Sequence, residues 1–355
     1  MSGRHAVVEE DLREIVSRVG PALDALSGRS LVVTGGTGLL GAYFTETVAW
    51  LNETRFATPC RLTAVVRRLP SETGPLSHLP RCPGIRFVAG DARAVPAEID
   101  GADFLVLAAT KGSPRHYLSD PIGTLELNGA GLGRWLELAS RVGSRAVLYF
   151  SSGEVYGTPD PEAVPTPETY VGRVDPAAPR SVYAEAKRYG EALALAYHRQ
   201  RGVPVKIVRP FQVFGPGVRA DDGRALPDFL AAAAAGRAPE LRSAGTASRT
   251  FLYVSDATVA FWQALLLGAP GSVYNVGSPG PEMTIRAAAE RVAALAANGC
   301  TVAVAADAEE SGAPARAVPD VGRLGREFGF APRHGFDDLV ARSLRWLRDQ
   351  PGGEP

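Results

Sequence analysis

Short apolar runs alternate along this chain with segments in which hydrophobic residues recur every three or four positions. The apolar runs predict strands, and they lie at residues 30–34, 61–66, 85–89, 104–107, 146–150 and 205–208. The periodic segments predict helices with one buried face, and they lie at residues 8–26, 39–51, 125–141 and 182–200. Such alternation is typical of parallel strands joined by covering helices. The pattern therefore predicts an α/β fold with a doubly wound parallel sheet.

The pattern also predicts how the chain divides. Residues 1–28 are expected to form an N-terminal helical extension that carries no chemistry, and residues 29–210 a nucleotide-binding domain. Residues 211–350 contain many glycines and prolines, which predicts loops and short elements. We expect them to form mainly a smaller substrate-binding lobe, with some segments returning to the first domain. The last residues, PGGEP, are expected to be a loose tail.

Composition narrows the classes of partner. The 355 residues are 45% hydrophobic, and 38 basic residues balance 38 acidic ones. No bulk charge therefore favours nucleic acid or an anionic membrane, and a small-molecule partner is expected. No run of eighteen apolar residues and no apolar signal core occurs, which indicates a cytoplasmic protein without a membrane anchor. Cys60, Cys82 and Cys300 lie far apart, so neither a metal site nor a disulfide framework is predicted.

A glycine-rich loop, TGGTGLLG at residues 34–41, lies directly between the first predicted strand and the first helix of the sheet. Gly35 would permit a tight turn, Gly38 would let backbone approach a pyrophosphate, and Gly41 would let helix and strand pack closely. The same triplet occurs in ordinary strand-to-helix turns. Its position nevertheless favours a dinucleotide site in a Rossmann-like sheet, with the anion at the helix N-terminus. The other loop residues expected to bind this cofactor are Thr37, Leu39 and Leu40.

The adenosine end of that site is unusual. Arg67 occupies the place after the second strand where an acid usually binds the ribose hydroxyls of NAD. Arg67 and Arg68 suit the 2′-phosphate of NADP, but a pair of arginines also stacks on adenine or lies in solvent. Both NAD and NADP stay open on these residues alone.

The sequence SVYAEAK places Tyr183 and Lys187 four residues apart, on one face of a predicted helix. A phenol with a pKa of about 10 is a poor base near neutrality. A neighbouring ammonium and a positive nicotinamide ring would favour the phenolate. Tyr183 would then take a proton from a hydroxyl, and both side chains would contact the cofactor. The same spacing also arises by chance on exposed helices, but it is less expected by chance downstream of a dinucleotide loop.

Three further blocks resemble one family. The segment TKGSPRHYLSDPIGTLELN at 110–128 is similar to an SP.HY...PI.T...N run, FSSGEVYG at 150–157 to an S[ST].EVYG block, and RPFQVFGPGVRADDGRALPDF at 209–229 to R.FN.[FY]GP....NDGRV...F. The first and third runs resemble those of UDP-glucuronate decarboxylases, or UDP-xylose synthases, and the second is shared by nucleotide-sugar decarboxylases and dehydratases. The decarboxylases fall in the extended short-chain dehydrogenase/reductase superfamily, the NAD-dependent epimerase/dehydratase family. The resemblance extends from residue 31 to about residue 292.

The resemblance implies roles for residues at the end of the fifth strand. Ser152 is expected to hydrogen-bond the sugar oxygen at C4, and Glu154 to protonate C5. The alternative is that both merely cap the loop backbone. Between them, Gly153 replaces the aspartic acid with which 4,6-dehydratases expel a hydroxyl, so that dehydration route is not expected. The decarboxylases usually have serine there, so Gly153 departs from their pattern as well.

The resemblance also implies ligand contacts. Arg224, in the DGR triplet, would address the glucuronate carboxylate with its planar fork, and Tyr117 would help. Gln212 stands where the family usually has asparagine near the sugar phosphate, and Arg249 matches a diphosphate-binding arginine. The remaining substrate contacts are expected from Glu154 and Tyr253. On the cofactor side, the resemblance implies NAD, with contacts from Asp91, Ala108 and Thr110.

The implied function is decarboxylation of UDP-glucuronate. Bound NAD oxidises C4, the C5 carboxylate leaves as carbon dioxide, and reduction gives UDP-xylose, with release of some UDP-4-ketopentose left open. The alternative within enzymes is a 4-epimerase of UDP-glucuronate or another nucleotide sugar. A catalytically inactive dinucleotide-binding regulator is the reading from a different class. Relatives dimerise through the helices that correspond to 125–141 and 182–200, which implies a homodimer.

Overall fold

The computed structural model describes residues 3–110, 112–219, 222–297, 299, 301–305 and 313–350. Cys300 and the predicted tail at 351–355 therefore lie outside the described residues. Among the residues described, no helix is both long enough and apolar enough to cross a membrane.

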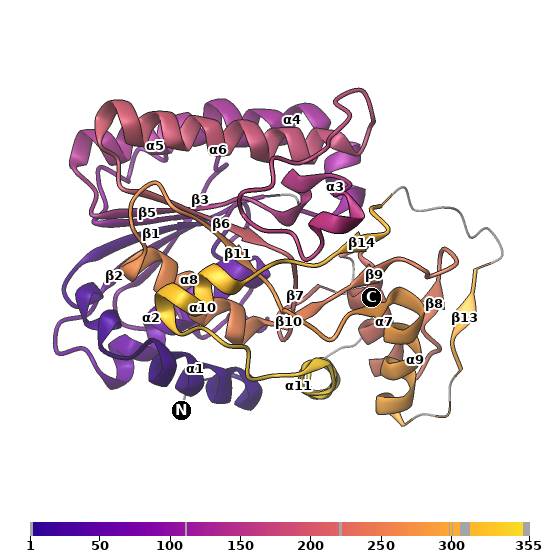
Figure 1. The fold of residues 1–355 in the computed structure, drawn as a ribbon. Helices are drawn as coiled ribbons and strands as arrows, with labels where there is room; N and C mark the ends of the chain where they lie inside the picture. The colour runs from indigo at the N-terminus through magenta and orange to yellow at the C-terminus, as the bar shows by residue number, and fades with distance from the viewer. Residues whose placement is uncertain are drawn as a thin grey trace.

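A parallel sheet of seven strands forms the centre of the molecule (Figure 1). Its spatial order is β11-β6-β5-β4-β1-β2-β3, and each neighbouring pair is parallel. The strands are β1 (Ser30–Thr34), β2 (Arg61–Val66), β3 (Ile85–Ala89), β4 (Phe104–Leu107), β5 (Ala146–Phe150), β6 (Val205–Pro210) and β11 (Val273–Val276). The order reverses between β1 and β4, as in a doubly wound sheet. The predicted fold class is confirmed.

Helices cover both faces of this sheet (Figure 1). One face carries α2 (Leu39–Thr54) and α8 (Val254–Leu267), and the other carries α4 (Pro121–Glu126), α5 (Leu132–Val142) and α6 (Ser181–Arg201). Every residue of β4 and β5 is buried, as expected of strands covered on both sides. The first layer is fixed by aromatic contacts, including Phe44 to Trp262 with ring centroids 4.5 Å apart.

The helix predicted at 125–141 is interrupted. The structure has α4, then a π-helical segment η3 (Leu127–Gly131), then α5. Asn128 lies in this segment, where its Nδ2 donates to the Thr124 carbonyl at 2.9 Å and its Oδ1 accepts from the Tyr149 hydroxyl at 3.0 Å. At Gly131 a side chain would place its Cβ 2.9 Å from the Arg93 Cα. These contacts lie within the widened turn, a feature often found near functional sites.

A smaller lobe follows α6 in the chain. It holds α7 (Ala225–Ala234) and α9 (Ile285–Ala296), the pair β8 (Glu240–Leu241) and β13 (Ala303–Val304), and a three-stranded sheet of β12 (Met283–Thr284), β9 (Ser248–Arg249) and β14 (Arg316–Ala317). The pair β7 (Gln212–Phe214) and β10 (Phe251–Tyr253) leads into it. The remaining elements are α3 (Pro114–Ser119), α10 (Gly322–Phe328), α11 (Phe336–Arg348), η2 (Leu79–Arg81), η4 (Gly153–Tyr156) and η5 (Pro161–Ala163).

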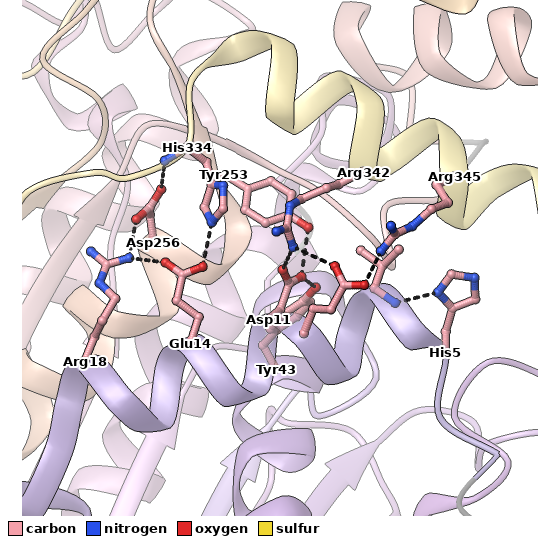
Figure 2. Close-up of polar contacts among 12 residues, drawn as sticks. His5, Asp11, Glu14, Arg18, Tyr43, Tyr253, Asp256, His334, Arg342 and Arg345 are labelled. Atoms are coloured by element: carbon pink, nitrogen blue, oxygen red, sulfur yellow. Dashed lines mark hydrogen bonds and ion pairs between the residues drawn. The ribbon is translucent and has the colours of Figure 1, made fainter.

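The N-terminal helix α1 (Ala6–Val19), with its continuation η1 (Gly20–Leu26), lies on α2 and α8. Figure 2 shows that its polar side chains point toward the C-terminal part of the chain. Asp11 is fully buried and accepts hydrogen bonds from Tyr43 at 2.7 Å, Tyr253 at 2.8 Å and Arg342 at 2.9 Å. Burial raises the pKa of Asp11 to about 6, although these donors oppose the rise. The helix thus ties α11 to the nucleotide-binding side.

Candidate active site

A cavity of about 1200 Å³ lies at the carboxyl ends of the central strands, between the large sheet and the smaller lobe. Such clefts at the switch point of a doubly wound sheet are the usual ligand sites of this architecture. A pocket for a single small ligand has a volume of about 300–1,000 Å³. This cavity therefore has room for a dinucleotide together with a second ligand.

The glycine-rich loop lines one end of the cavity, and its geometry suits a pyrophosphate. Gly35 has φ +73°, which side chains rarely adopt. A side chain at Gly41 would place its Cβ 2.2 Å from the Gly35 carbonyl oxygen, so close packing requires glycine there. Gly38 is the N-cap of α2. Since the first amides of α2 have no partner within the helix, they are free to bind an anion. Thr37, Leu39 and Leu40 also line this end.

The adenosine end carries unpaired positive charge. Arg67 and Arg68 are exposed, line the cavity and make no hydrogen bond or ion pair among the described residues. Asp91 also lines the cavity, but Arg93 donates to its Oδ2 from Nη2 at 2.7 Å and from Nε at 3.1 Å. These hydrogen bonds lower the pKa of Asp91. An adenine amino group would therefore meet a carboxylate that already accepts hydrogen bonds from Arg93. Ala108 and Thr110 line the cavity beyond β4.

Tyr183 and Lys187 lie on α6, as predicted, but they have different environments. The side chains of Thr110 and Ser152 lie close enough to the Tyr183 hydroxyl to oppose the rise of its pKa that burial causes. Lys187 lies behind it, with Nζ 5.8 Å from the Tyr183 ring centroid, and donates to the Phe150 carbonyl at 2.7 Å. Burial lowers the pKa of Lys187 to about 7. Lys187 does not line the cavity.

The same burial changes the expected state of the phenol. Desolvation raises the pKa of Tyr183, while the side chains of Thr110 and Ser152 and the charge of Arg224 oppose the rise. The phenol is therefore protonated at neutral pH in the protein alone. A positively charged ligand above it would lower this pKa.

Ser152 and Glu154 both line the cavity, at the start of η4. The Ser152 Oγ accepts from the Glu154 amide at 3.2 Å and also reaches Tyr183, so it caps the loop and faces the site at once. At Gly153 a side chain would place its Cβ 3.0 Å from the Phe211 ring. A larger residue at this position would therefore require the ring to shift.

Tyr117 lies on α3 and stacks on Tyr183, with ring centroids 5.1 Å apart and planes at 11°. Burial raises the pKa of Tyr117 to about 12. The structure thus brings the 110–128 segment directly onto the candidate base.

Arg224 is the N-cap residue of α7 and lines the cavity. Its guanidinium lies over the Phe214 ring at 4.6 Å and pairs with Asp222. Gly223 between them has φ +80°, which glycine alone adopts easily. A side chain there would place its Cβ 3.4 Å from the Arg115 Cβ, so this turn packs against the 110–128 segment.

Of the other predicted contacts, Gln212 and Arg249 line the cavity, whereas Tyr253 does not. Arg249 is nearly buried, donates to the Ser248 carbonyl at 2.7 Å and has its pKa lowered by desolvation. Tyr253 is fully buried and its hydroxyl donates to Asp11 (Figure 2). The expected substrate contact from Tyr253 is therefore wrong, because its ring packs on the side of α1.

Arg180 and Ser113 are among the cavity residues to which the sequence analysis gave no role. Arg180, the N-cap residue of α6, lines the cavity, and its charge acts on Tyr117 and Arg249. Its position three residues before Tyr183 was the available signal, since residues at this spacing share a helix face. The Ser113 hydroxyl is buried at the cavity wall without a hydrogen-bond partner among the described residues.

A doubly wound sheet with a glycine-rich loop and a Tyr–Lys pair beside one large cavity defines a dinucleotide-dependent enzyme of the short-chain dehydrogenase type. A model of the NAD dependent epimerase/dehydratase family matches residues 31–277. The chain belongs to this family, as its sequence predicted, and NAD as the family's cofactor is confirmed.

Curated relatives carry one activity in their names. UDP-glucuronic acid decarboxylase 5 of Arabidopsis thaliana is 36% identical over 225 residues, 63% of this chain and 64% of that protein. UDP-glucuronic acid decarboxylase 1 of Xenopus tropicalis is 30% identical over 322 residues, 91% of this chain and 73% of that protein. The match to the Arabidopsis protein thus spans less than two thirds of that protein's length.

Solved structures support the fold. A dTDP-glucose 4,6-dehydratase from Streptomyces venezuelae, crystallised with NAD, is 26% identical with a TM-score of 0.76, over 90% of this chain and 97% of that one. A UDP-glucuronic acid 4-epimerase from Bacillus cereus, also with NAD, has a TM-score of 0.74 over 92% of this chain and 98% of that one. Its identity is 19%, so it shows the shared fold and no more.

Proposed function

We propose that this chain is a UDP-glucuronate decarboxylase that forms UDP-xylose. One observation carries the proposal: Arg224, a carboxylate-binding group by its chemistry, lines the same cavity as Tyr183, near enough that its charge lowers the phenol's pKa. The stacking of Tyr117 on Tyr183 supports it, because this stack joins the segment that resembles the decarboxylases to the candidate base. The names of the curated relatives point the same way.

The proposed reaction begins at C4. Tyr183 takes the proton of the 4-hydroxyl while Ser152, which lies close enough to oppose the rise of the Tyr183 pKa, holds the same oxygen. Bound NAD would accept the C4 hydride and later return it. The resulting ketone is β to the carboxylate at C5, so the electron pair of the C5–carboxylate bond can move into an enolate as carbon dioxide leaves. Tyr183 and Ser152 stabilise the enolate oxygen, and Glu154 supplies the proton to C5.

Lys187 acts through Tyr183 in this proposal. Its Nζ lies 5.8 Å from the phenol ring and is held by the Phe150 carbonyl. A positive charge at this place favours the phenolate once the ligands are bound. We include Arg249 as the group that binds the diphosphate, with Arg180 beside it on the cavity wall.

The environment of Gly153 disfavours a dehydratase. Loss of a hydroxyl needs an acid next to the sugar, and glycine has no proton to give. The Phe211 ring, 3.0 Å from the position of a Cβ at Gly153, leaves an acid no room without moving. The proposed decarboxylation needs no group there.

We also propose that the chain forms a homodimer through α4 and α6, which contact each other. Large apolar side chains are exposed on these helices: Ile122 at 70%, Tyr189 at 57% and Leu125 at 46%. Ile122→Glu should give a monomer by light scattering, whereas Leu267→Glu, exposed on α8, should leave the dimer intact. A cytoplasmic location is part of the proposal, and the free thiols of Cys60 and Cys82 suit a reducing compartment.

The test is to incubate the protein with UDP-glucuronate and NAD, and to measure carbon dioxide and the mass of the nucleotide sugar. Release of one carbon dioxide per sugar, abolished by Tyr183→Phe, is the expected result. Arg224→Ala should lose this activity, and the matched control is Arg237→Ala, exposed beyond α7. A new isomer of unchanged mass would indicate a 4-epimerase instead. Tight dinucleotide binding without turnover of any nucleotide sugar would indicate a regulator.

A further inference from the structure

The carboxylate of Asp222 is bound to the Arg224 guanidinium, the group that we assign to the substrate carboxylate. Arg224 donates from Nε to Asp222 Oδ1 at 2.5 Å and from Nη2 to Oδ2 at 2.9 Å. This is the bidentate arrangement that a bound carboxylate would otherwise adopt. Both side chains line the cavity, and they are 30% and 18% exposed.

Other contacts of the same turn favour the pair. The Arg224 guanidinium lies over the Phe214 ring at 4.6 Å, which fixes the plane of the fork. The turn at Gly223, with φ +80°, points Asp222 and Arg224 to the same side. The turn itself is held against Arg115 and Ser113. A substrate carboxylate must therefore share Arg224 with Asp222 or displace it.

Arg224 alone would be a poor catalyst of decarboxylation. Only interactions that are stronger in the transition state than in the ground state accelerate a reaction. An unshared arginine stabilises the starting carboxylate, whose charge is lost when carbon dioxide leaves. A neighbouring carboxylate changes this balance, because it repels the substrate carboxylate and the repulsion disappears as the charge moves to the C4 oxygen beside Tyr183.

We propose that Asp222 is a positioning residue that shares Arg224 with the substrate carboxylate and weakens its hold, so that binding is looser and carbon dioxide leaves faster. This rests on the proposed decarboxylase function. The chemistry is unchanged: the C5–carboxylate bond breaks, its electron pair enters the enolate, and the carboxyl group becomes carbon dioxide. Asp222 exchanges no atom or proton with the substrate.

Asp222→Asn tests the inference, because it keeps the size of the side chain and removes its charge. We expect the Kd for UDP-glucuronate to fall about tenfold and kcat for carbon dioxide release to fall at least about tenfold, as removal of one nearby charge implies. The Kd for UDP-xylose, which lacks the carboxylate, should stay the same. The control is Asp338→Asn, the same charge change at an exposed position on α11 outside the cavity, and it should alter neither constant.

Opposite changes in affinity and turnover are the signature of the proposed role. If Asp222→Asn weakens binding and turnover together, Asp222 only holds Arg224 in place and the inference is overturned. If neither constant changes, it is overturned as well. If the unaltered protein releases no carbon dioxide, the decarboxylase proposal fails. The binding measurement with UDP-glucuronate and UDP-xylose would still decide whether Asp222 competes for Arg224.

Discussion

Tyr117 and Tyr183 stack on each other in the wall of the candidate active site, with ring centroids 5.1 Å apart and ring planes at 11°. Tyr117 is held on the short helix α3 and Tyr183 on the long helix α6. Both rings are buried. The stack couples the segment expected to recognise the sugar to the phenol expected to remove its proton.

This stack predicts an order of activities among variants. Tyr117→Phe keeps the ring and removes a hydroxyl, whereas Tyr117→Leu removes the aromatic contact. A stacked pair contributes about 0.5–1.5 kcal/mol beyond its buried area. We expect Tyr117→Leu to lower kcat/KM about tenfold relative to Tyr117→Phe in steady-state decarboxylation. Equal activities of the two variants would mean that the stack does not position Tyr183.

Substitution of Lys187 is expected to raise the stability of the protein and to lower its activity. Burial lowers its pKa from 10.5 to about 7, so folding disfavours its charged form. That penalty is absent above pH 10.5 and grows as the pH falls to 7, where it is on the order of 4 kcal/mol. Loss of the hydrogen bond to Phe150 costs about 1–3 kcal/mol.

Lys187→Met should therefore unfold at a higher temperature than the unaltered protein at pH 7, while its turnover falls at least about a hundredfold. The measurements are thermal unfolding by circular dichroism and carbon dioxide release. A variant that is less stable at pH 7 would show that the ammonium is better solvated than its burial implies.

Arg67 predicts tolerance of NADP. The end of β2 carries no acid to bind the ribose hydroxyls or repel a 2′-phosphate, and Arg67 and Arg68 are unpaired among the described residues. We expect the Kd for NADP to lie within about tenfold of the Kd for NAD. A charge-assisted contact from arginine to the 2′-phosphate would offset the usual preference of the family for NAD. Arg67→Asp should weaken NADP and strengthen NAD, whereas Arg199→Asp, exposed near the end of α6, should change neither. Calorimetry on nucleotide-free protein measures this, and NADP binding more than a hundredfold weaker than NAD would refute it.

The contact between α1 and the C-terminal segment predicts a pH-dependent stability (Figure 2). His334 Nε2 lies 2.7 Å from the Glu14 carboxylate. The hydrogen bond to Glu14 raises the pKa of His334 above 6.5. Burial alone would raise the pKa of Glu14. The hydrogen bonds and charges of His334 and Arg18 outweigh it and lower this pKa from 4.5 to about 2.

The histidine contributes its stability in full below pH 6.5 and loses it as the pH rises through its raised pKa. The glutamate contributes above pH 4.5 and loses its share as the pH falls toward about 2. His334→Gln should thus reduce the free energy of unfolding most between pH 4.5 and 6.5 and least above pH 8. The charge of His334 also lowers the pKa of Asp11, so removal of the imidazole adds to the deficit in the same pH range. A deficit that is constant from pH 5 to 9 in urea titrations would rule out the charged pair.

The sequence predicted local features well and distant contacts badly. Strands β1 to β5 begin and end at the predicted residues. The central strands β4 and β5 are buried on both faces and are therefore continuous apolar runs. The glycine-rich loop and the Tyr–Lys spacing also depend only on neighbouring residues. Tyr253 was misassigned because its partner Asp11 lies 242 positions away, beyond any local pattern. The interruption of the 125–141 helix lies where Gly131 approaches Arg93, which is likewise a tertiary contact.

The most direct test of the proposed function uses UDP-glucuronate with deuterium at C4. The protein is incubated with this sugar and NAD, and the mass and deuterium position of the product are determined. The account predicts a UDP-pentose that has lost one carbon dioxide and kept the deuterium at C4, because the same hydride leaves and returns within one cavity. A product of unchanged mass, or a decarboxylated pentose without deuterium at C4, would contradict it.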